Sequence, residues 1–99
     1  MFKQLNPLLH SQLRLAVMSI LIESTTAEFT FIKNETQATA GNLSVQLNKL
    51  KDAGYINIDK TFKGNYPQTL CTITKDGVAA FEEYVESIKA VSYTHLTLP

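Results

Sequence analysis

The feature that most constrains the fold is a change of periodicity between residues 39 and 74. In its first part, Leu43, Leu47 and Leu50 follow helical spacing, with Thr39 in the position of a helix cap and Gly54 as terminator. Over 55–62 and again over 68–74, apolar and polar residues alternate as they do in half-buried strands. We therefore predict a helix over about 39–53 and a β-hairpin over about 55–74.

A second, shorter helix is expected just before the first. Residues 31–37 can form it, and Ala38–Gly41 then supply the tight turn between the two helices. Two short helices joined in this way form a helix-turn-helix. Upstream, Glu28–Phe31 alternates like a short strand, and Asn6-Pro7 predicts a short helical lead-in through His10.

Two longer helices are predicted at the ends of the domain, over 12–23 and 75–91. The first is apolar around most of its circumference, and a domain of this size has few ways to cover both sides of such a helix alone. The last carries an apolar stripe opposite three glutamates. We expect both helices to pair two subunits in a homodimer, through Leu15, Met18, Ile22, Phe81, Tyr84, Val85 and Ile88.

The composition of the chain limits which classes of protein it can belong to. The chain has 99 residues, 44% of them apolar and 18% charged, which suits one folded domain, here placed at 1–91. The longest apolar run is too short to cross a bilayer, and the start lacks the features of a secretion signal, so a cytoplasmic protein is expected. A single cysteine, Cys71, and two histidines give no metal-ligand spacing, and we expect neither metal nor cofactor.

No arrangement of side chains suggests catalysis. The sequence lacks a glycine-rich phosphate loop and a nucleophile elbow, and adjacent Glu82 and Glu83 point in different directions on a helix. An enzyme is therefore not expected. The closing stretch, 92–99, fits no helix period and resembles translated adapter sequence, so it is expected to be a non-native or disordered tail.

Charge is distributed unevenly although the net charge is zero. Residues 1–75 hold eight cationic and five acidic side chains, whereas the remainder holds Lys89 against four acids. The two parts of the chain are therefore expected to face different surroundings, one of which suits DNA. A mixed, solvated surface would show a similar asymmetry.

The stretch Thr39–Ile56 resembles the recognition helix of small bacterial and archaeal winged-helix regulators. Those proteins typically show Gly-Asn-Leu-Ser, two spaced leucines and Ala-Gly-Tyr before the wing, and the similarity extends over about 7–91. The chain is in this respect similar to the MarR and ArsR groups. The resemblance implies a dimeric transcription factor with an α+β, mainly α, winged helix-turn-helix fold of order α-β-α-α-β-β-α and a C-terminal dimerisation helix. The chain departs from the pattern of these regulators at Tyr66, where relatives often have arginine, and at Gln46, where many have histidine.

The predicted recognition helix has the chemistry for reading DNA. With its leucines facing the core, its outer face carries short hydrogen-bonding groups suited to the major groove. Asparagine and glutamine can pair with adenine, Val45 can meet a thymine methyl, and cations can bind phosphates, the hairpin tip reaching toward the neighbouring minor groove. The candidate DNA-binding residues are Thr39, Asn42, Ser44, Val45, Gln46, Asn48, Lys49, Lys51, Lys60 and Lys63.

Other interpretations of the same residues remain open. Lys60 and Lys63 can equally protect the edge of a hairpin against strand pairing, and the outer face of the helix can be an ordinary solvated face. A winged helix can also serve as a protein-interaction module without DNA binding, which the near-neutral charge allows. Cys71 alternates with Ile73 and is expected to be a small buried residue.

Overall fold

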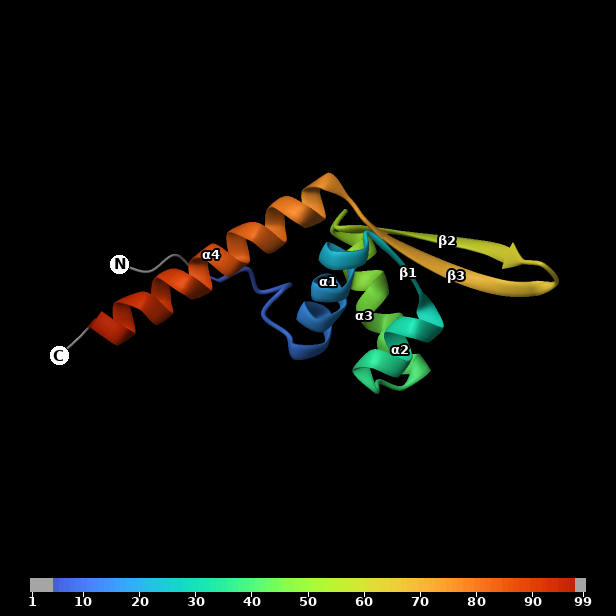
Figure 1. Ribbon diagram of the computed structural model, residues 1–99, viewed down its shortest axis with the longest axis horizontal. Coiled ribbons are helices and arrows are strands. Elements are labelled where there is room, and N and C mark those ends of the chain that lie inside the picture. The colour runs from blue at the N-terminus through green and yellow to red at the C-terminus, as the bar shows by residue number, and fades with distance from the viewer. Residues whose placement is uncertain (1–4, 98–99) are drawn as a thin grey trace.

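The computed structural model describes the backbone of residues 5–97 and the side chains of residues 5–90. Three helices form the body, a long hairpin leaves it on one side, and a long last helix leaves it on the other, so that the molecule measures 60 × 25 × 21 Å (Figure 1). The elements are α1 (Gln12–Ser24), β1 (Thr26–Glu28), α2 (Phe29–Thr36), α3 (Ala40–Asp52), β2 (Ile56–Lys63), β3 (Tyr66–Ile73) and α4 (Lys75–Thr97). The predicted order of elements is confirmed.

One core joins the three helices to the base of the sheet. The leucines of α3 are 2% exposed or less, as their helical spacing predicts, and burying each contributes about 1.5–3 kcal/mol. They meet fully buried side chains from the other elements, which are Leu9, Val17, Met18, Leu21, Ile32, Ile56 and Cys71. This core fixes the orientation of α3, whose opposite face is left in solvent.

The sheet is antiparallel with strand order β1-β3-β2. Strands β2 and β3 pair along their full length, from Ile56 opposite Ile73 to Lys63 opposite Tyr66, and Gly64 takes a positive φ of 64° in the turn between them. The short β1 pairs only with residues 70–72. The outer half of the hairpin therefore projects beyond the body as a wing, defined here as residues 59–70.

The predicted strand at Glu28–Phe31 is displaced. The observed strand is β1, two residues earlier, and Phe29 already begins α2. Pairing with β3 decides the position, because the Thr25 carbonyl accepts from Ile73 N at 3.0 Å and the Thr26 and Thr72 hydroxyl oxygens lie 3.1 Å apart. Phe29 and Phe31, whose alternation with polar residues suggested a strand, belong instead to the first turn of α2, which buries Ile32.

The two ends of the described chain also differ from the prediction. The expected lead-in helix is a single turn, in which the Asn6 side chain accepts from Leu8 N at 3.0 Å and the Asn6 carbonyl accepts from His10 N at 2.9 Å. Helix α4 continues to Thr97, past the predicted end at residue 91, since no proline or glycine interrupts it after Gly77.

Two residues predicted at a subunit interface lie inside the monomer. Met18 is fully buried, and Tyr84 is 5% exposed with its hydroxyl 3.0 Å from His10 Nδ1. The apolar surface of α1 is thus covered partly by its own domain rather than by a second subunit. Of the other predicted contacts, Ile22 and Ile88 are each 37% exposed, and the half-buried ones are Leu15, Phe81 and Val85.

A single residue, Thr74, joins β3 to α4. Its hydroxyl accepts from Gly77 N at 3.0 Å and donates to the Gly54 carbonyl at 2.6 Å, while its own N–H donates to the Tyr55 carbonyl at 3.0 Å. The bond from Gly77 N makes Thr74 the N-terminal cap of α4. Together, the bonds of Thr74 fix the start of α4 to the segment that follows α3.

Candidate nucleic-acid interface

Helix α3 presents the candidate base-reading residues from a well-defined start. The Thr39 side chain accepts from Asn42 N at 3.1 Å, as predicted for the cap, and Gln37 makes the turn from α2 in the left-handed region with φ of 57°. Because successive residues turn by about 100°, burial of the three leucines places Val45, Asn48 and Lys49 outermost. Val45 is 51% exposed.

The remaining polar residues of α3 lie on its two flanks. Ser44 is on the flank toward the wing, where it lines a groove of about 260 Å³ together with Asn48 and Lys60. Asn42 and Gln46 are on the opposite flank, toward α1, and Gln46 is half-buried there. Helix α3 and the wing thus share one groove, which Asn48 lines, whereas Asn42 and Gln46 lie outside it.

Arg14 of α1 is a functional candidate that the sequence analysis missed. Its guanidinium Nη1 donates to Gln46 Oε1, and its Nε donates to the Leu8 carbonyl at 2.5 Å. Gln46 Nε2 in turn donates to Asn42 Oδ1 at 3.0 Å. The available signal was that Arg14 is the only arginine of the chain and interrupts an otherwise apolar helix.

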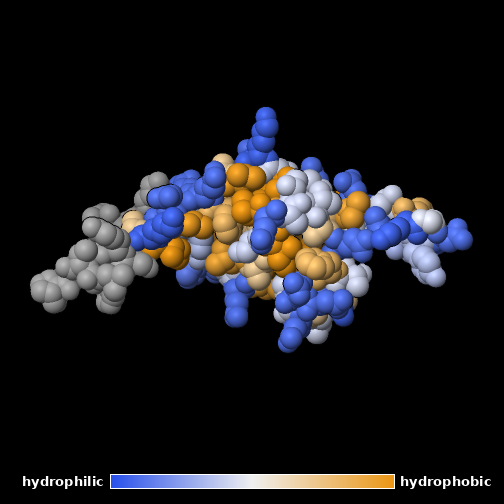
Figure 2. All heavy atoms as spheres, viewed as in Figure 1, coloured by the Kyte–Doolittle hydropathy of each residue, from blue (hydrophilic) through white to orange (hydrophobic). Residues whose placement is uncertain are grey.

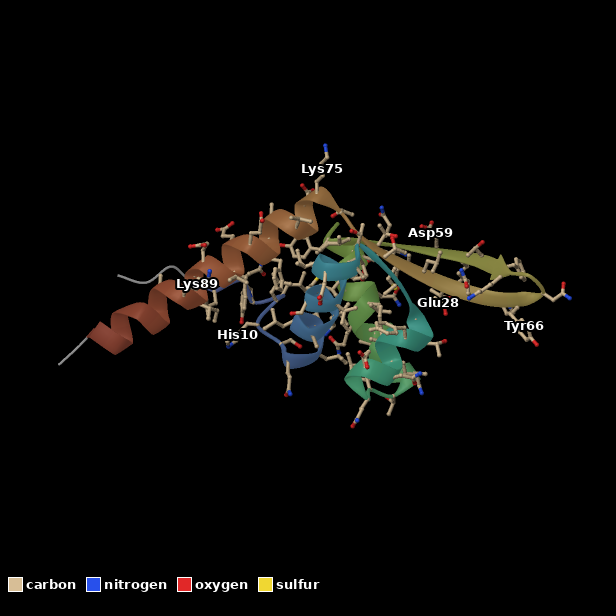
Figure 3. All side chains as sticks on the ribbon, viewed as in Figure 1. His10, Glu28, Asp59, Tyr66, Lys75 and Lys89 are labelled. Atoms are coloured by element: carbon tan, nitrogen blue, oxygen red, sulfur yellow. The ribbon has the colours of Figure 1, made fainter. Side chains whose placement is uncertain are left out.

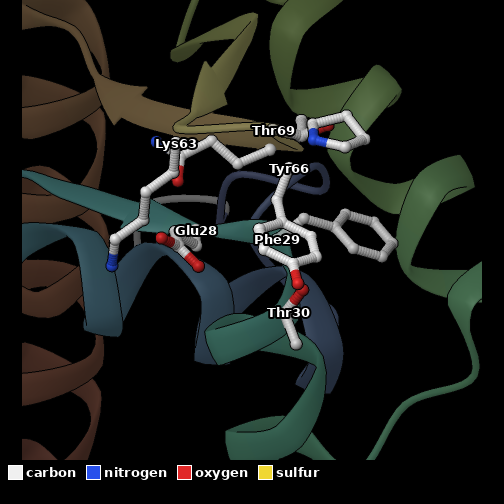
Figure 4. Close-up of a pocket in the computed structure, with 8 residues that line it drawn as sticks. Glu28, Phe29, Thr30, Lys63, Tyr66 and Thr69 are labelled. Atoms are coloured by element: carbon white, nitrogen blue, oxygen red, sulfur yellow. The ribbon is translucent and has the colours of Figure 1, made fainter.

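The two wing lysines lie on opposite faces of the hairpin. Side chains alternate along β2, so Lys60 shares a face with the buried Ile56 and looks toward α3, whereas Lys63 shares the other face with Asp59. Lys63 lines a separate, open cavity of about 630 Å³ with Glu28, beside α2 (Figure 4). Lys60 therefore has the more favourable position for a phosphate near α3.

The end of the wing is aromatic. Phe62 is 71% exposed and Tyr66 is 78% exposed, and the Tyr66 side chain projects from the outer part of the hairpin (Figure 3). Tyr66 also lines the 630 Å³ cavity, where the buried Gln68 Oε1 has no hydrogen-bond partner among the described residues. Where the MarR-like pattern has an arginine, this wing offers apolar contact area instead.

Charge separates along the long axis of the molecule. Helix α3 and the wing expose lysines at 49, 51, 60 and 63 and carboxylates at Asp52 and Asp59. Helix α4 exposes glutamates at 82, 83 and 86. Apolar side chains gather over α1 and the adjoining half of α4, and the wing is mainly hydrophilic (Figure 2). Positive charge is thus concentrated at the recognition helix and wing.

The described residues show no arrangement suited to a metal ion or to a membrane span. No cluster of three or more histidine, cysteine or acidic side chains there is arranged to hold a metal ion. None of the helices in that part of the chain is both long and apolar enough to span a membrane. Cys71 is buried, and burial raises the pKa of its thiol to about 11.

Comparison with known proteins agrees with this architecture. The family model described as "Winged helix DNA-binding domain" matches residues 13–91. An uncharacterized protein of Methanocaldococcus jannaschii, MJ0432, is 29% identical over 83 residues, covering 84% of this chain and 90% of its own. A structure described as a transcriptional regulator homologue from Pyrococcus horikoshii is 28% identical and superposes with a TM-score of 0.84, covering 92% of this chain and 89% of that one.

A more distant structure shares the fold. It is a mutant of MarR from Escherichia coli in complex with operator DNA, 18% identical with a TM-score of 0.70, and the match covers 92% of this chain and 64% of that one. The matched family is one of DNA-binding domains, in agreement with the expectation that the chain is not an enzyme. Helix-turn-helix, wing and family match together show that the chain belongs to the winged helix DNA-binding domain family.

Proposed function

We propose that the chain is a homodimeric transcriptional regulator that binds double-stranded DNA. Helix α3 enters the major groove, and the wing contacts the backbone and the adjacent minor groove. The observation that carries the proposal is the shared groove between the outer face of α3 and the wing, where Ser44, Asn48 and Lys60 converge. Because such a protein acts where the chromosome is, the proposal includes a cytoplasmic location.

The proposed contacts divide by chemistry. Val45 and the polar groups of α3 meet base edges, and cations on α3 and β2 meet phosphates. Lys60 is the preferred wing cation, because Lys63 shares its face with a carboxylate. The full proposed set is Thr39, Asn42, Ser44, Val45, Gln46, Asn48, Lys49, Lys51, Lys60 and Lys63.

The proposal includes a dimer because a single subunit carries few cations for binding phosphates. Weak single-site binding becomes useful affinity when two linked recognition helices engage DNA together. The proposed contact surface consists of the exposed Ile22 and Ile88 with the half-buried Leu15, Phe81 and Val85. The Pyrococcus horikoshii protein, described as a transcriptional regulator homologue, and the operator complex of MarR support this function by analogy.

A salt titration tests DNA binding. The affinity of the full chain for a duplex carrying its own upstream region is measured between about 50 and 200 mM salt, where each neutralised phosphate contributes about −0.9 to the logarithmic slope. Lys60→Ala removes one cation from each of the two subunits and is expected to make the slope for the dimer shallower by about 2. Lys89→Ala, which removes the same charge from the far end of the molecule (Figure 3), is expected to leave it unchanged. Binding that is absent or insensitive to salt would contradict the proposal.

Sedimentation tests the dimer separately. The wild-type chain is expected to be dimeric at tens of micromolar, and Ile88→Glu is expected to make it monomeric by burying an unpaired charge in the interface. Phe31→Glu places the same charge on α2, at a residue that is 49% exposed, and should leave the dimer intact. A wild-type chain that sediments strictly as a monomer would refute this part.

A second function is favoured by one observation. Phe31, Val45, Phe62 and Tyr66 are large apolar side chains with 49–78% exposure, which also suits a protein partner. A protein-interaction module would show loss of partner binding on Phe62→Ala and no salt-dependent binding to any duplex. The titration above therefore distinguishes the two functions.

A further inference from the structure

A chain of hydrogen bonds connects α1 to the reading face of α3. It runs from Arg14 to the side-chain oxygen of Gln46, and from the Gln46 amino group to the side-chain oxygen of Asn42. Arg14 is itself held by the Leu8 carbonyl. The residue at its end, Asn42, is exposed on α3.

The chemistry of the three groups allows one orientation. A guanidinium only donates, so the oxygen of the Gln46 amide must face Arg14. The Gln46 amino group is thereby turned toward Asn42. Because this amino group also only donates, the Asn42 amide must accept its hydrogen bond through the side-chain oxygen. Both amide orientations therefore follow from the position of Arg14 and not from a choice between equivalent flips.

The consequence concerns the atoms left facing outward. The Asn42 oxygen faces Gln46, from which it accepts, and the Asn42 backbone N–H donates to the Thr39 side chain, so the amino group is the part of the Asn42 amide that faces away from Gln46 and is left for a ligand. A bidentate contact with adenine needs one acceptor and one donor from the same amide, whereas guanine presents two acceptors side by side in the major groove. The bound amide matches guanine.

We propose that Arg14 is a positioning residue that holds Asn42 as a hydrogen-bond donor, so that the base contacted by Asn42 is guanine rather than adenine. This differs from the expectation that the amides of Asn42 and Gln46 pair with adenine. It rests on the proposed function, in which α3 lies in the major groove.

In vitro selection from a pool of random duplexes tests the proposal with the full chain. The wild type is expected to enrich guanine over adenine about tenfold at one position of each half-site. Asn42→Ala should abolish the preference at that position. Arg14→Lys keeps a donor-only cation and should retain guanine.

The decisive variant is Gln46→Glu. A carboxylate accepts from Arg14 but cannot donate, so the Asn42 amino group turns toward it and the Asn42 oxygen faces outward. The preferred base should then change to one that donates in the groove, cytosine or adenine. Asn34→Asp, which adds the same charge at an exposed residue of α2 outside the proposed contact set, should leave the guanine position unchanged. Thermal unfolding of each variant confirms that it is folded.

The outcomes separate this proposal from the function on which it rests. If the wild type enriches no sequence at all, the proposed function fails and the role of Arg14 fails with it. If the wild type enriches a sequence but prefers adenine at the Asn42 position, or if Gln46→Glu leaves the preferred base unchanged, the role of Arg14 is refuted while DNA binding stands.

Discussion

Replacing Gly77 with alanine would add a methyl group where the structure has no room for one. Gly77 lies in the first turn of α4 and packs directly on the segment after α3. A Cβ at this position would lie 2.2 Å from the Tyr55 carbonyl oxygen, 2.9 Å from Ile73 Cγ1 and 3.0 Å from the Tyr55 carbonyl carbon. Two of these three atoms belong to the backbone and cannot rotate away, so the start of α4 must move.

The expected change in the free energy of unfolding follows from one stabilising and two destabilising contributions. Alanine gains up to about 1 kcal/mol over glycine inside a helix. Against this stand overpacking, which costs about 1–3 kcal/mol or more, and weakening of the bond from Thr74 N to the same Tyr55 carbonyl, worth about 1 kcal/mol. Because the approach is so close, we expect Gly77→Ala to destabilise the fold by about 2–3 kcal/mol, a fall of roughly 10–20 °C in Tm.

Urea unfolding at one fixed protein concentration measures the effect, since the proposed dimer would make stability depend on concentration. Gly41→Ala is the matched control. Gly41 lies in the first turn of α3 with open space around its Cα, so alanine there should stabilise the fold by about 0.5–1 kcal/mol. If Gly77→Ala proved as stable as the wild type, the close packing of α4 on Tyr55 would be wrong.

Three further predictions follow from single contacts. Thr39→Ala should cost about 1 kcal/mol of unfolding free energy in urea because Asn42 N loses its cap, whereas Thr39→Ser should cost much less. Burial raises the pKa of the Cys71 thiol from 9.0 to about 11. The contribution of this thiol to the free energy of unfolding should therefore be complete below pH 9 and fall by at most about 1.4 kcal/mol per pH unit from 9 to 11. A Cys71→Ala chain that lost as much stability over that range would contradict this cause. Phe62→Ala should weaken binding to a duplex without changing the slope of affinity against salt, in contrast to Lys60→Ala, and an altered slope would show that the wing aromatic does not act by apolar contact.

The sequence was sufficient for the parts of the fold that local patterns determine. Leucine spacing, the Thr39 cap and the alternation after Gly54 led to α3 and the hairpin within about two residues. The short strand was placed wrongly because its position depends on pairing with residues 70–72, far away in the sequence. Met18 and Tyr84 were assigned to an interface because apolarity does not distinguish a core from a subunit contact.

The candidate site was predictable in type but not in arrangement. Polar residues opposite a leucine stripe indicated which face of α3 is outermost, yet Asn42 and Gln46 lie on the flank that α1 approaches. Arg14 lies 32 residues from Gln46 in the sequence, and no local pattern links the two. The opposite orientation of Lys60 and Lys63 did follow from strand alternation, once the register was known.

The one-residue connection at Thr74 has a consequence for the spacing of DNA half-sites. In a dimer paired through α4, the separation of the two recognition helices depends on the angle at which α4 leaves each domain, and that angle is held by the bonds of Thr74 to Gly54, Tyr55 and Gly77. Inserting one residue into α4 just after this turn would rotate the rest of the helix by about 100° and shift it by about 1.5 Å. Each domain would keep its own base preference, but the pair would no longer fit the same operator.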